Sequence, residues 1–374
     1  MAPMMWLLSA IVLCLAYANG ANDTVKGAAT LFGTGTADYR KTLSWATVTT
    51  LLGSLAALWA GSELLSAFRG KGLVPDALLA DPRFLASVGF GAAATVLLAT
   101  RLGFPISTTH ALVGALVGAG LAAPRGEVHP AALWQSFLLP LLLSPFIAFT
   151  LSVLLYRLFR GARLRLGVDR ETCLCVGEEV RVLACAPVAP MTAIPALTEA
   201  RMTATVGTRV QCVQRYSGRV TGVDAQTALD ALHYLSSGAV CFARGLNDTP
   251  KIAALLLLVQ GMPGRTGIVG IALAMGLGGI LKARRVAETM SHRIAGMNHG
   301  QGFTANLVSA VLVLFASRLG LPVSTTHVTC GALFGIGTVN RTARWPMIAG
   351  ISLAWTVTLP LSALLAAAGM GILR

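Results

Sequence analysis

The sequence predicts an all-α polytopic membrane protein built from two related, inverted halves, and three observations lead to this prediction. The 374 residues are 55 % hydrophobic and only 12 % charged, with a mean hydropathy of +0.71, whereas a soluble globular protein carries about 25 % charged residues. Long Leu-, Ala- and Val-rich runs recur along almost the whole chain, as expected where lipid is the solvent. Two polar motifs also occur twice in the same order.

Taking about 20 apolar residues as one crossing, we expect ten hydrophobic segments, five on each side of a polar stretch. They are 4–32 (broken), 43–66, 84–101, 105–123, 132–158, 228–260 (broken), 266–282, 302–318, 322–339 and 345–370. The first is interpreted as a membrane helix and not a signal peptide, because no Lys or Arg precedes Lys26. The predicted domains are a first transmembrane repeat (1–158), a polar cytoplasmic insert (159–227) and a second, inverted repeat (228–374).

The insert 159–227 is expected to be small and β-rich, since residues 179–183 and 209–213 alternate polar and apolar side chains like short strands. Four of the seven cysteines lie in it: Cys173, Cys175, Cys185 and Cys212. Their spacing matches no zinc-binding pattern, so no metal site is predicted. The cysteines of the chain are dispersed, so no disulfide framework is predicted either.

An internal repeat organises the two hydrophobic halves. Residues 101–118 and 318–335 agree at 12 of 18 positions, and both contain the motif Pro-x-Ser-Thr-Thr-His. The motif Gly-x-Asn-Asp likewise occurs at 20–23 and again at 245–248. Because each half holds an odd number of predicted crossings, the second half enters the membrane upside down. This is the inverted repeat of secondary transporters, with broken helices and hairpins around a central site.

Composition and charge exclude several other classes of protein. The net charge of +14 does not indicate a nucleic-acid partner, because the basic residues lie between apolar runs and cluster at 157–165. By the positive-inside rule this cluster is cytoplasmic, which places both termini outside. We expect no enzyme and no cofactor, because no nucleophile–base pair or metal-ligand set is apparent. A channel would need a continuous polar lining, whereas these polar residues gather in two symmetric motifs.

Ionisable groups within apolar spans mark functional sites, and the repeated Gly-x-Asn-Asp segments contain four of them. These are Asp23, Lys26, Asp248 and Lys251. Gly20, Gly245 and the neighbouring Asn and Thr side chains favour a break in each helix, and Pro250 favours one in the second half. Such a break is tolerated only beside protein or a cavity. The alternative is that each Asp forms only a local helix pair with the Lys three residues on.

The two Pro-x-Ser-Thr-Thr-His motifs place N-capping hydroxyls ahead of an apolar helix. Unpaired N–H groups, the positive end of the helix dipole and the hydroxyls together suit an oxyanion. The hydroxyl residues are Ser107, Thr108, Thr109, Ser324, Thr325 and Thr326. The simpler interpretation is that they only cap buried helix ends. We interpret His110 and His327 as hydrogen-bonded packing residues in preference to a proton relay.

The two carboxylates restrict the choice of oxyanion. An ionised Asp repels a bare anion, so Asp23 and Asp248 must be protonated, balanced by a cation or lysine, or hydrogen-bonded to a proton of the substrate. Phosphate keeps a proton near neutral pH, whereas sulfate has none. The motifs therefore favour phosphate, or its mimic arsenate. A sulfate or other oxyanion permease of the same fold is the alternative.

The doubled motifs, with Gln301-Gly302-Phe303, resemble those of the inorganic phosphate transporter (PiT) family of secondary transporters. The resemblance covers both hydrophobic halves and excludes only the insert. It implies phosphate symport driven by sodium or protons and a homodimer, and we expect a multi-pass protein in the lipid of a bacterial-type cell membrane. It also implies which residues contact phosphate or its coupling cation: Asn22, Asp23, Ser107, Thr108, Thr109, Asn247, Asp248, Ser324, Thr325 and Thr326.

The chain departs from the family pattern at four positions. The family motif often continues to an Asn where this chain has Lys26 and Lys251, and sodium-coupled members carry a glutamate at the positions aligned with Thr50 and Asn306. A fixed ammonium can offset an Asp charge and attract phosphate as a bound sodium does. We therefore expect H⁺ as the coupling ion, with Na⁺ coupling weak or absent. The alternative is that both lysines are structural and extend to the membrane interface.

Overall fold

The first half begins with two helices separated by a turn. In a computed structural model of the chain, α1 (Ala2–Asp23) is followed by turns over residues 24–28 and then by α2 (Ala29–Gly33). The break predicted within 4–32 is confirmed. The structure describes residues 2–60, 65, 72–124, 126–182, 198–257 and 264–373.

The long helices lie where the hydrophobic runs predict them. The first half continues with α3 (Tyr39–Ala60), α5 (Asp76–Leu79), α6 (Pro82–Leu102), α7 (Thr108–Ala122), α8 (Pro130–Ala132), the π-helix η1 (Leu133–Leu138) and α9 (Leu139–Arg165). The second half contains α11 (Ala225–Leu257), α12 (Gly264–Lys282), α13 (Arg284–Glu288), the π-helix η2 (Thr289–Arg293), α14 (His299–Arg318), α15 (Thr325–Val339) and α16 (Trp345–Ile372). Seven helices of the described residues are long and apolar enough to cross a membrane.

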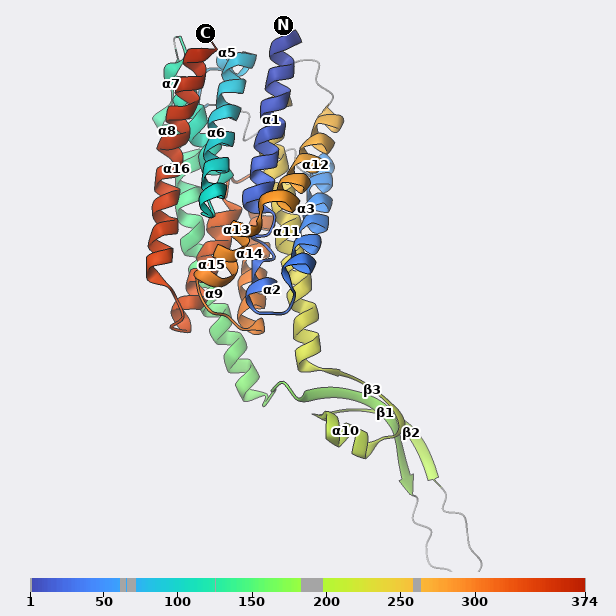
Figure 1. The fold of residues 1–374 in the computed structure, drawn as a ribbon. Coiled ribbons are helices and arrows are strands. Elements are labelled where there is room, and N and C mark those ends of the chain that lie inside the picture. The colour runs from blue at the N-terminus through green and yellow to red at the C-terminus, as the bar shows by residue number, and fades with distance from the viewer. Residues whose placement is uncertain are drawn as a thin grey trace, which may run out of the picture. The chain divides into compact units, whose positions relative to one another are not determined.

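The chain falls into two units. The helical unit comprises Met1–Tyr156 with His233–Arg374, and the insert unit comprises Arg157–Leu232. Within the helical unit, α1 and α11 carry the two Asn-Asp pairs and run in opposite directions, and both termini lie at the same end (Figure 1). This is the inverted arrangement that the odd number of crossings predicts. The motif helices α7 and α15 have only 15 residues each, about 22 Å against a hydrocarbon core of about 30 Å. The expectation that 105–123 and 322–339 are full crossings is therefore wrong.

The second half does not contain the predicted helix break. Helix α11 is continuous from Ala225 to Leu257 with Pro250 inside it, so the expected interruption of 228–260 is wrong. A proline removes one N–H from the helix, whereas a full break would leave several backbone groups unpaired in a medium without water. The helix therefore continues through the proline.

Glycines of the Asn-Asp segments bring helices together. A Cβ on Gly20 would lie 1.8 Å from the backbone oxygen of Met275 in α12, and one on Gly245 would lie 2.2 Å from the backbone oxygen of Thr50 in α3. Helix α1 ends at Asp23, three residues after Gly20, whereas α11 continues past Gly245 to Leu257, so the predicted loosening is wrong for Gly245. Their small size instead permits close backbone approach, as at many membrane helix interfaces.

The two motif helices are held by matched contacts of the same kind. A Cβ on Gly118 of α7 would lie 1.9 Å from the backbone oxygen of Ala363 in α16, and one on its counterpart Gly335 of α15 would lie 2.6 Å from that of Phe149 in α9. Each helix carries a second glycine at four-residue spacing. Such pairs let helix backbones pack closely in lipid. They fix the positions at which α7 and α15 begin.

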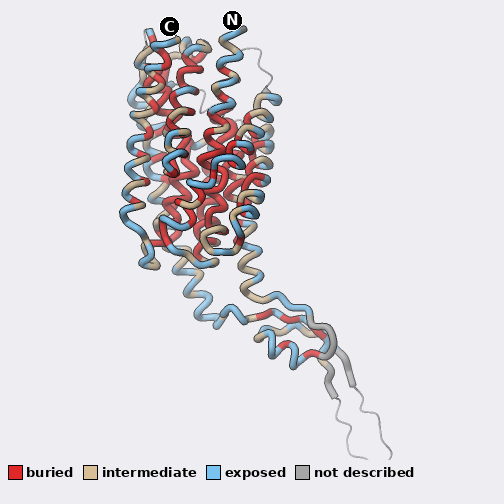
Figure 2. Tube along the Cα trace, in the orientation of Figure 1, coloured by how far each residue is buried: buried red, intermediate tan, exposed pale blue. Residues whose placement is uncertain are grey.

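Burial in the helical unit has the distribution of a membrane protein. Buried positions fill its interior, whereas outward faces are exposed (Figure 2). Large apolar side chains occupy those outward faces, among them Trp59 and Phe315, which are 79 % and 64 % exposed. An apolar outer surface suits contact with lipid tails. With the spanning helices, it identifies a multi-pass integral membrane protein.

The insert unit contains a three-stranded antiparallel sheet, as its predicted β-rich character requires. The central strand β1 (Thr172–Val182) pairs with β2 (Thr198–Thr208) on one side and β3 (Ser217–Asp224) on the other. The predicted strand 179–183 falls in β1 as far as residue 182, and residue 183 lies outside the described residues.

The second predicted strand of the insert is wrong. Residues 209–213 lie in a helix, α10 (Arg209–Arg215). Thr208 and Gln211 form a capping box, in which each side chain accepts a hydrogen bond from the other residue's backbone N–H. This local signal starts a helix and outweighs the alternating polarity of five residues.

The insert also contains a disulfide that was not predicted. Cys175 of β1 is bonded to Cys212 of α10, and the Sγ of Cys173 lies 3.2 Å from that of Cys175. The bonded cysteines are 37 residues apart, and only the folding of α10 against β1 brings them together. The expectation of no disulfide is therefore corrected. Cys185 lies outside the described residues, and the cytoplasmic position of the insert stays a prediction.

The close contact between α7 and α16 gives a test of the fold. We expect Gly118→Ala to lower the stability of the protein by about 1–3 kcal/mol, because the added methyl group must push the two helices apart. Thermal unfolding of detergent-purified protein measures the effect. Gly161→Ala in α9 is the control, because its Cβ would meet nothing within 4 Å. Equal unfolding temperatures for Gly118→Ala and wild type would contradict the packing described here.

Candidate functional site

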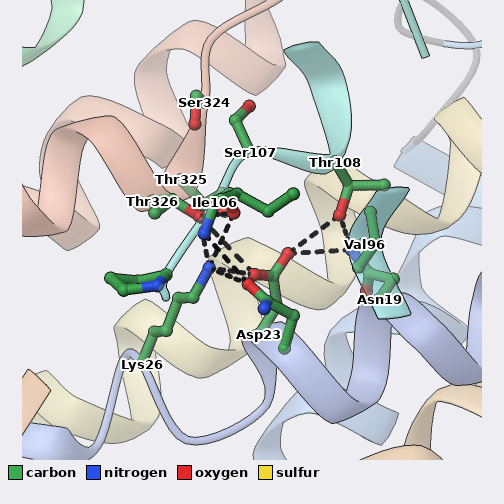
Figure 3. Close-up of polar contacts among 12 residues, drawn as sticks. Asn19, Asp23, Lys26, Val96, Ile106, Ser107, Thr108, Ser324, Thr325 and Thr326 are labelled. Atoms are coloured by element: carbon green, nitrogen blue, oxygen red, sulfur yellow. Dashed lines mark hydrogen bonds and ion pairs between the residues drawn. The ribbon is translucent and has the colours of Figure 1, made fainter. Parts of the chain in front are cut away.

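The motif helices α7 and α15 begin at matched serine caps. Ser107 and Ser324 have the same backbone angles (φ −95°, ψ 116°). The Oγ of each accepts a hydrogen bond of 3.1 Å from the backbone N–H three residues on, that of His110 or His327. The capping role weighed for these hydroxyls is therefore present for both serines. Figure 3 shows the two serines on the two motif segments that meet near Asp23.

Asp23 and Lys26 form a buried ion pair at the end of α1, and the side chain of each is 1 % exposed. The Nζ of Lys26 also donates to the backbone oxygen of Ile106, at 2.8 Å, and to Oγ1 of Thr326, at 2.8 Å. Ile106 belongs to the first Ser-Thr-Thr motif and Thr326 to the second. One ammonium group thus connects both motifs to one carboxylate (Figure 3).

The second half repeats this arrangement. The Nζ of Lys251 lies 3.4 Å from Oδ1 of Asp248 and donates to the backbone oxygen of Val323 and to Oγ1 of Thr109, each at 2.9 Å. Val323 and Thr109 are the repeat counterparts of the two residues that Lys26 contacts. Each lysine therefore binds the motif of its own half and a threonine of the other half. Neither side chain extends to the surface, which contradicts the interfacial alternative.

The two asparagines position the motif segments. The Nδ2 of Asn22 donates to Oγ1 of Thr100 at 2.9 Å, and its Oδ1 accepts from the backbone N–H of Ile106 at 3.2 Å. The Oδ1 of Asn247 accepts from Oγ of Ser317 at 3.2 Å. Ser317 is the repeat counterpart of Thr100, so the same pair of positions is hydrogen-bonded in both halves, with the asparagine donating in the first half and accepting in the second. In this structure both asparagines bind protein groups that hold the cage in place.

Asn19 joins the two carboxylates and is absent from the residues that the sequence predicts. Its Nδ2 donates to Oδ2 of Asp23 and to Oγ1 of Thr108, each at 2.9 Å, and lies 3.4 Å from Oδ2 of Asp248. The side chain is completely buried. Asn19 lies one helical turn before Asp23, so the i, i+4 spacing on α1 could have identified it.

Arg244 is a third buried cation that sequence reasoning missed. Its side chain is 1 % exposed, and its Nε lies 3.7 Å from Oδ2 of Asp248. It lies in an apolar run four residues before Asp248, so the rule that marks ionisable groups in apolar spans could have found it. Shifted by the 225 residues that relate the Asn-Asp motifs, Arg244 corresponds to Asn19. The two halves therefore differ in charge at this position.

The histidines of the two motifs lie against each other. Their ring centroids are 4.5 Å apart, and the ring of His327 is 3.9 Å from that of Trp355. The Nδ1 of His327 lies 3.2 Å from the backbone oxygen of Leu141. These contacts join α7, α15 and α16 beside the site. The Nδ1 of His110 and the Nε2 of His327 have no hydrogen-bond partner among the described residues, so the packing role stays a prediction.

All ten residues predicted to contact phosphate or its cation are at most 5 % exposed. We call these residues, with Asn19, Lys26, Arg244 and Lys251, the central cage. The ten predicted members are Asn22, Asp23, Ser107, Thr108, Thr109, Asn247, Asp248, Ser324, Thr325 and Thr326. The contacts above connect residues from both halves into one buried polar cluster. The side chains of Ser107 and Ser324 take part only as caps of their own helices, and Thr325 lies between Ser324 and Thr326 at the start of α15. With two helix N-termini, hydroxyl donors and paired charges, the cluster has the chemistry of an oxyanion site.

Comparison with known proteins agrees with this architecture. The "Probable low-affinity inorganic phosphate transporter" of Rhizobium meliloti is 26 % identical to the chain over 98 % of the chain and 95 % of its own length. "Inorganic phosphate transporter 2-1, chloroplastic" of Arabidopsis thaliana is 27 % identical over 94 % of the chain and 69 % of its own length. A solved structure titled "The sodium-dependent phosphate transporter" has the same fold, with a TM-score of 0.74 and 20 % identity over 99 % of each chain. The profile of the phosphate transporter family matches residues 19–366, and the chain therefore belongs to that family.

Proposed function

We propose that the protein is a secondary transporter that moves inorganic phosphate across the membrane by alternating access, with protons and not sodium as the coupling ion. The observation that carries the proposal is the pair of buried lysines, each bound to an aspartate of its own half and a threonine of the other. By family resemblance, the working unit is a homodimer in a bacterial-type cell membrane.

The cage supplies what protonated phosphate needs. Hydroxyl groups and the first N–H groups of α7 and α15 are donors for its oxygens. The carboxylates of Asp23 and Asp248 can accept hydrogen bonds from its protons. Charge-assisted hydrogen bonds of this kind are stronger than those between neutral groups. Sulfate lacks the proton that the carboxylates would accept.

The lysines take the place of coupling cations. Each ammonium group already lies beside a buried carboxylate, where a sodium ion would otherwise supply the positive charge. The positions at which sodium-coupled members carry glutamates are the uncharged Thr50 and Asn306, so two anionic cation ligands are missing. A covalently attached cation cannot cross the membrane with the substrate. It attracts phosphate without coupling transport to a sodium gradient.

The crossed contacts also fit alternating access. Each lysine links the motif of one half to a threonine of the other. Movement of one repeat against the other must break or exchange these hydrogen bonds. A bound phosphate can replace them by accepting from the same ammonium groups. The substrate would then determine when the two halves are free to move.

We expect Asp23→Asn and Asp248→Asn each to reduce phosphate uptake roughly tenfold or more, because each removes an ionic hydrogen-bond acceptor. Uptake of labelled phosphate into proteoliposomes measures the effect, normalised to folded protein by size-exclusion chromatography. Asp38→Asn is the matched control, because Asp38 also pairs with a lysine three residues on but is 60 % exposed. Normal uptake in both cage variants would show that the carboxylates have no part in transport.

Competition separates phosphate from the alternative substrate. Unlabelled arsenate should inhibit the uptake of labelled phosphate, whereas sulfate at the same concentration should not, because sulfate offers no proton to Asp23 or Asp248. Inhibition by sulfate as strong as that by arsenate would favour the general oxyanion permease.

Replacing sodium with choline tests the coupling ion. Wild-type uptake should continue at full rate without sodium and should increase when the side that supplies phosphate is made more acidic. In the double variant Lys26→Asn with Lys251→Asn, sodium-independent uptake should fall roughly tenfold or more, because two buried carboxylates lose their cations. The matched control is Lys41→Asn, whose side chain is 73 % exposed. Strict sodium dependence of the wild type would refute the proposed role of the lysines.

A further inference from the structure

Arg244 is buried without enough partners for its guanidinium group. Its Nε, Nη1 and Nη2 atoms have no hydrogen-bond acceptor among the described residues, although the side chain is only 1 % exposed. A guanidinium group has five N–H donors, carries its charge at all physiological pH values and cannot accept a hydrogen bond. Buried donors without acceptors are costly and rare. An anionic ligand would satisfy them.

The guanidinium group lies at the edge of the central cage. Its Nε is 3.7 Å from Oδ2 of Asp248, and the same oxygen lies 3.4 Å from Nδ2 of Asn19. Asn19 in turn donates to Asp23 and Thr108. Arg244 therefore lies beside the carboxylate of Asp248, which in turn contacts the Asn19 amide that joins both halves of the cage.

The charges buried in the described part of the chain do not cancel. They comprise two carboxylates and three cations: Asp23, Asp248, Lys26, Arg244 and Lys251. With neutral histidines, this set carries one net positive charge. An uncompensated buried charge is destabilising because it has lost its hydration. A bound monovalent anion would neutralise the set, whereas a divalent anion would give it a net negative charge.

We propose that Arg244 is a ligand of the transported phosphate and makes the cage selective for its monovalent form, H₂PO₄⁻. This inference rests on the proposed function and names the charge state of its substrate. The planar guanidinium group can bind two phosphate oxygens at once, which is the geometry that arginine favours. Both protons of H₂PO₄⁻ remain available for Asp23 and Asp248. The proton that accompanies transport is then one that phosphate itself carries.

The comparison of the two halves identifies Arg244 as the source of the selectivity. The two Asp–Lys pairs are repeat counterparts and together are neutral. The counterpart of Arg244 is the uncharged Asn19. The excess charge therefore comes from one side chain in one half, and substitution of that side chain changes the net charge of the cage without altering either Asp–Lys pair.

Other titratable groups lie near the cage, and a test must distinguish their protonation from the protonation of phosphate. On α11, Arg244 is flanked by Cys241 and Asp248. The remaining titratable or charged groups around the cage are Asp23, Lys26, Lys251, His110 of α7, and His327 and Cys330 of α15. Histidines can titrate in the same range as phosphate. A probe of fixed charge distinguishes the two causes.

Phosphate binding to the detergent-purified full-length protein, measured by titration calorimetry without sodium, tests the charge selectivity. Between about pH 6 and pH 8 the Kd for total phosphate should rise on the order of tenfold, as the monovalent fraction falls. Hypophosphite stays monovalent over this range but has no O–H proton, so it should bind more weakly than phosphate and with the same Kd at both pH values, whereas divalent sulfate should not compete. A constant or falling phosphate Kd would overturn the inference. Equal pH dependence for phosphate and hypophosphite would also overturn it, because protein groups would then be titrating.

Substitutions assign the selectivity to Arg244. We expect Arg244→Gln to raise the Kd for phosphate roughly tenfold or more at about pH 6, and Arg244→Lys to bind more weakly than wild type but with the wild-type pH dependence. Arg265→Gln, on the exposed start of α12, is the control and should bind as wild type does. Wild-type affinity in Arg244→Gln would overturn the inference. If Arg244→Gln does not fold, Arg244→Lys and the wild-type pH series decide the question.

The outcomes distinguish this inference from the proposed function. Wild-type protein that transports and binds phosphate, together with an Arg244→Gln variant of unchanged affinity, would refute the role of Arg244 alone. Wild-type protein that neither binds nor transports phosphate would refute the proposed function and this inference with it.

Discussion

The structure depends on compensating charge where water is absent. Two aspartates lie inside the helical unit, and each is stable there only because a cation and several donors surround it. Two of the cations are lysines, and each donates to a backbone oxygen of its own half and to a threonine of the opposite half. One requirement, that no charge stays buried alone, therefore determines how the halves fit together. The same requirement gathers hydroxyl and charged groups of both halves at their meeting point.

Close helix packing makes that meeting point possible. The hydroxyls at the start of α7 and α15 can lie near the same charged residues only if both helices begin deep inside the helical unit. Backbone contacts at glycines position the helices there. In lipid the hydrophobic effect adds little between helices, so close van der Waals contact has to stabilise the arrangement. The glycines thus determine how closely the helices approach, and the charged residues determine how the two halves align.

Much of the fold and of the site can be predicted from the sequence because each polar motif occurs twice. The positions of the hydrophobic helices, the break within 4–32, the β-rich insert and the grouping of both motifs are all visible in the pattern of residues. The continuity of α11 could not be predicted, because the sequence around Pro250 does not show whether this proline begins a helix or lies inside one. Helix α10 and the Cys175–Cys212 disulfide depend on local capping and on sheet register. Asn19 and Arg244 lie outside the repeated motifs, so the search for matched residues passed over them.

The two halves differ at one buried position of the cage, where Arg244 is the counterpart of Asn19. Perfectly matched halves would bury two Asp–Lys pairs, and the net charge of such a cage would favour neither an anion nor a cation. Arg244 opposite Asn19 removes that balance. In the proposed mechanism, the inverted repeat supplies the symmetric geometry for opening toward either side of the membrane, and the unmatched charge of Arg244 attracts the anion. The repeated geometry and the unmatched charge of Arg244 therefore have different roles in the proposed transport cycle.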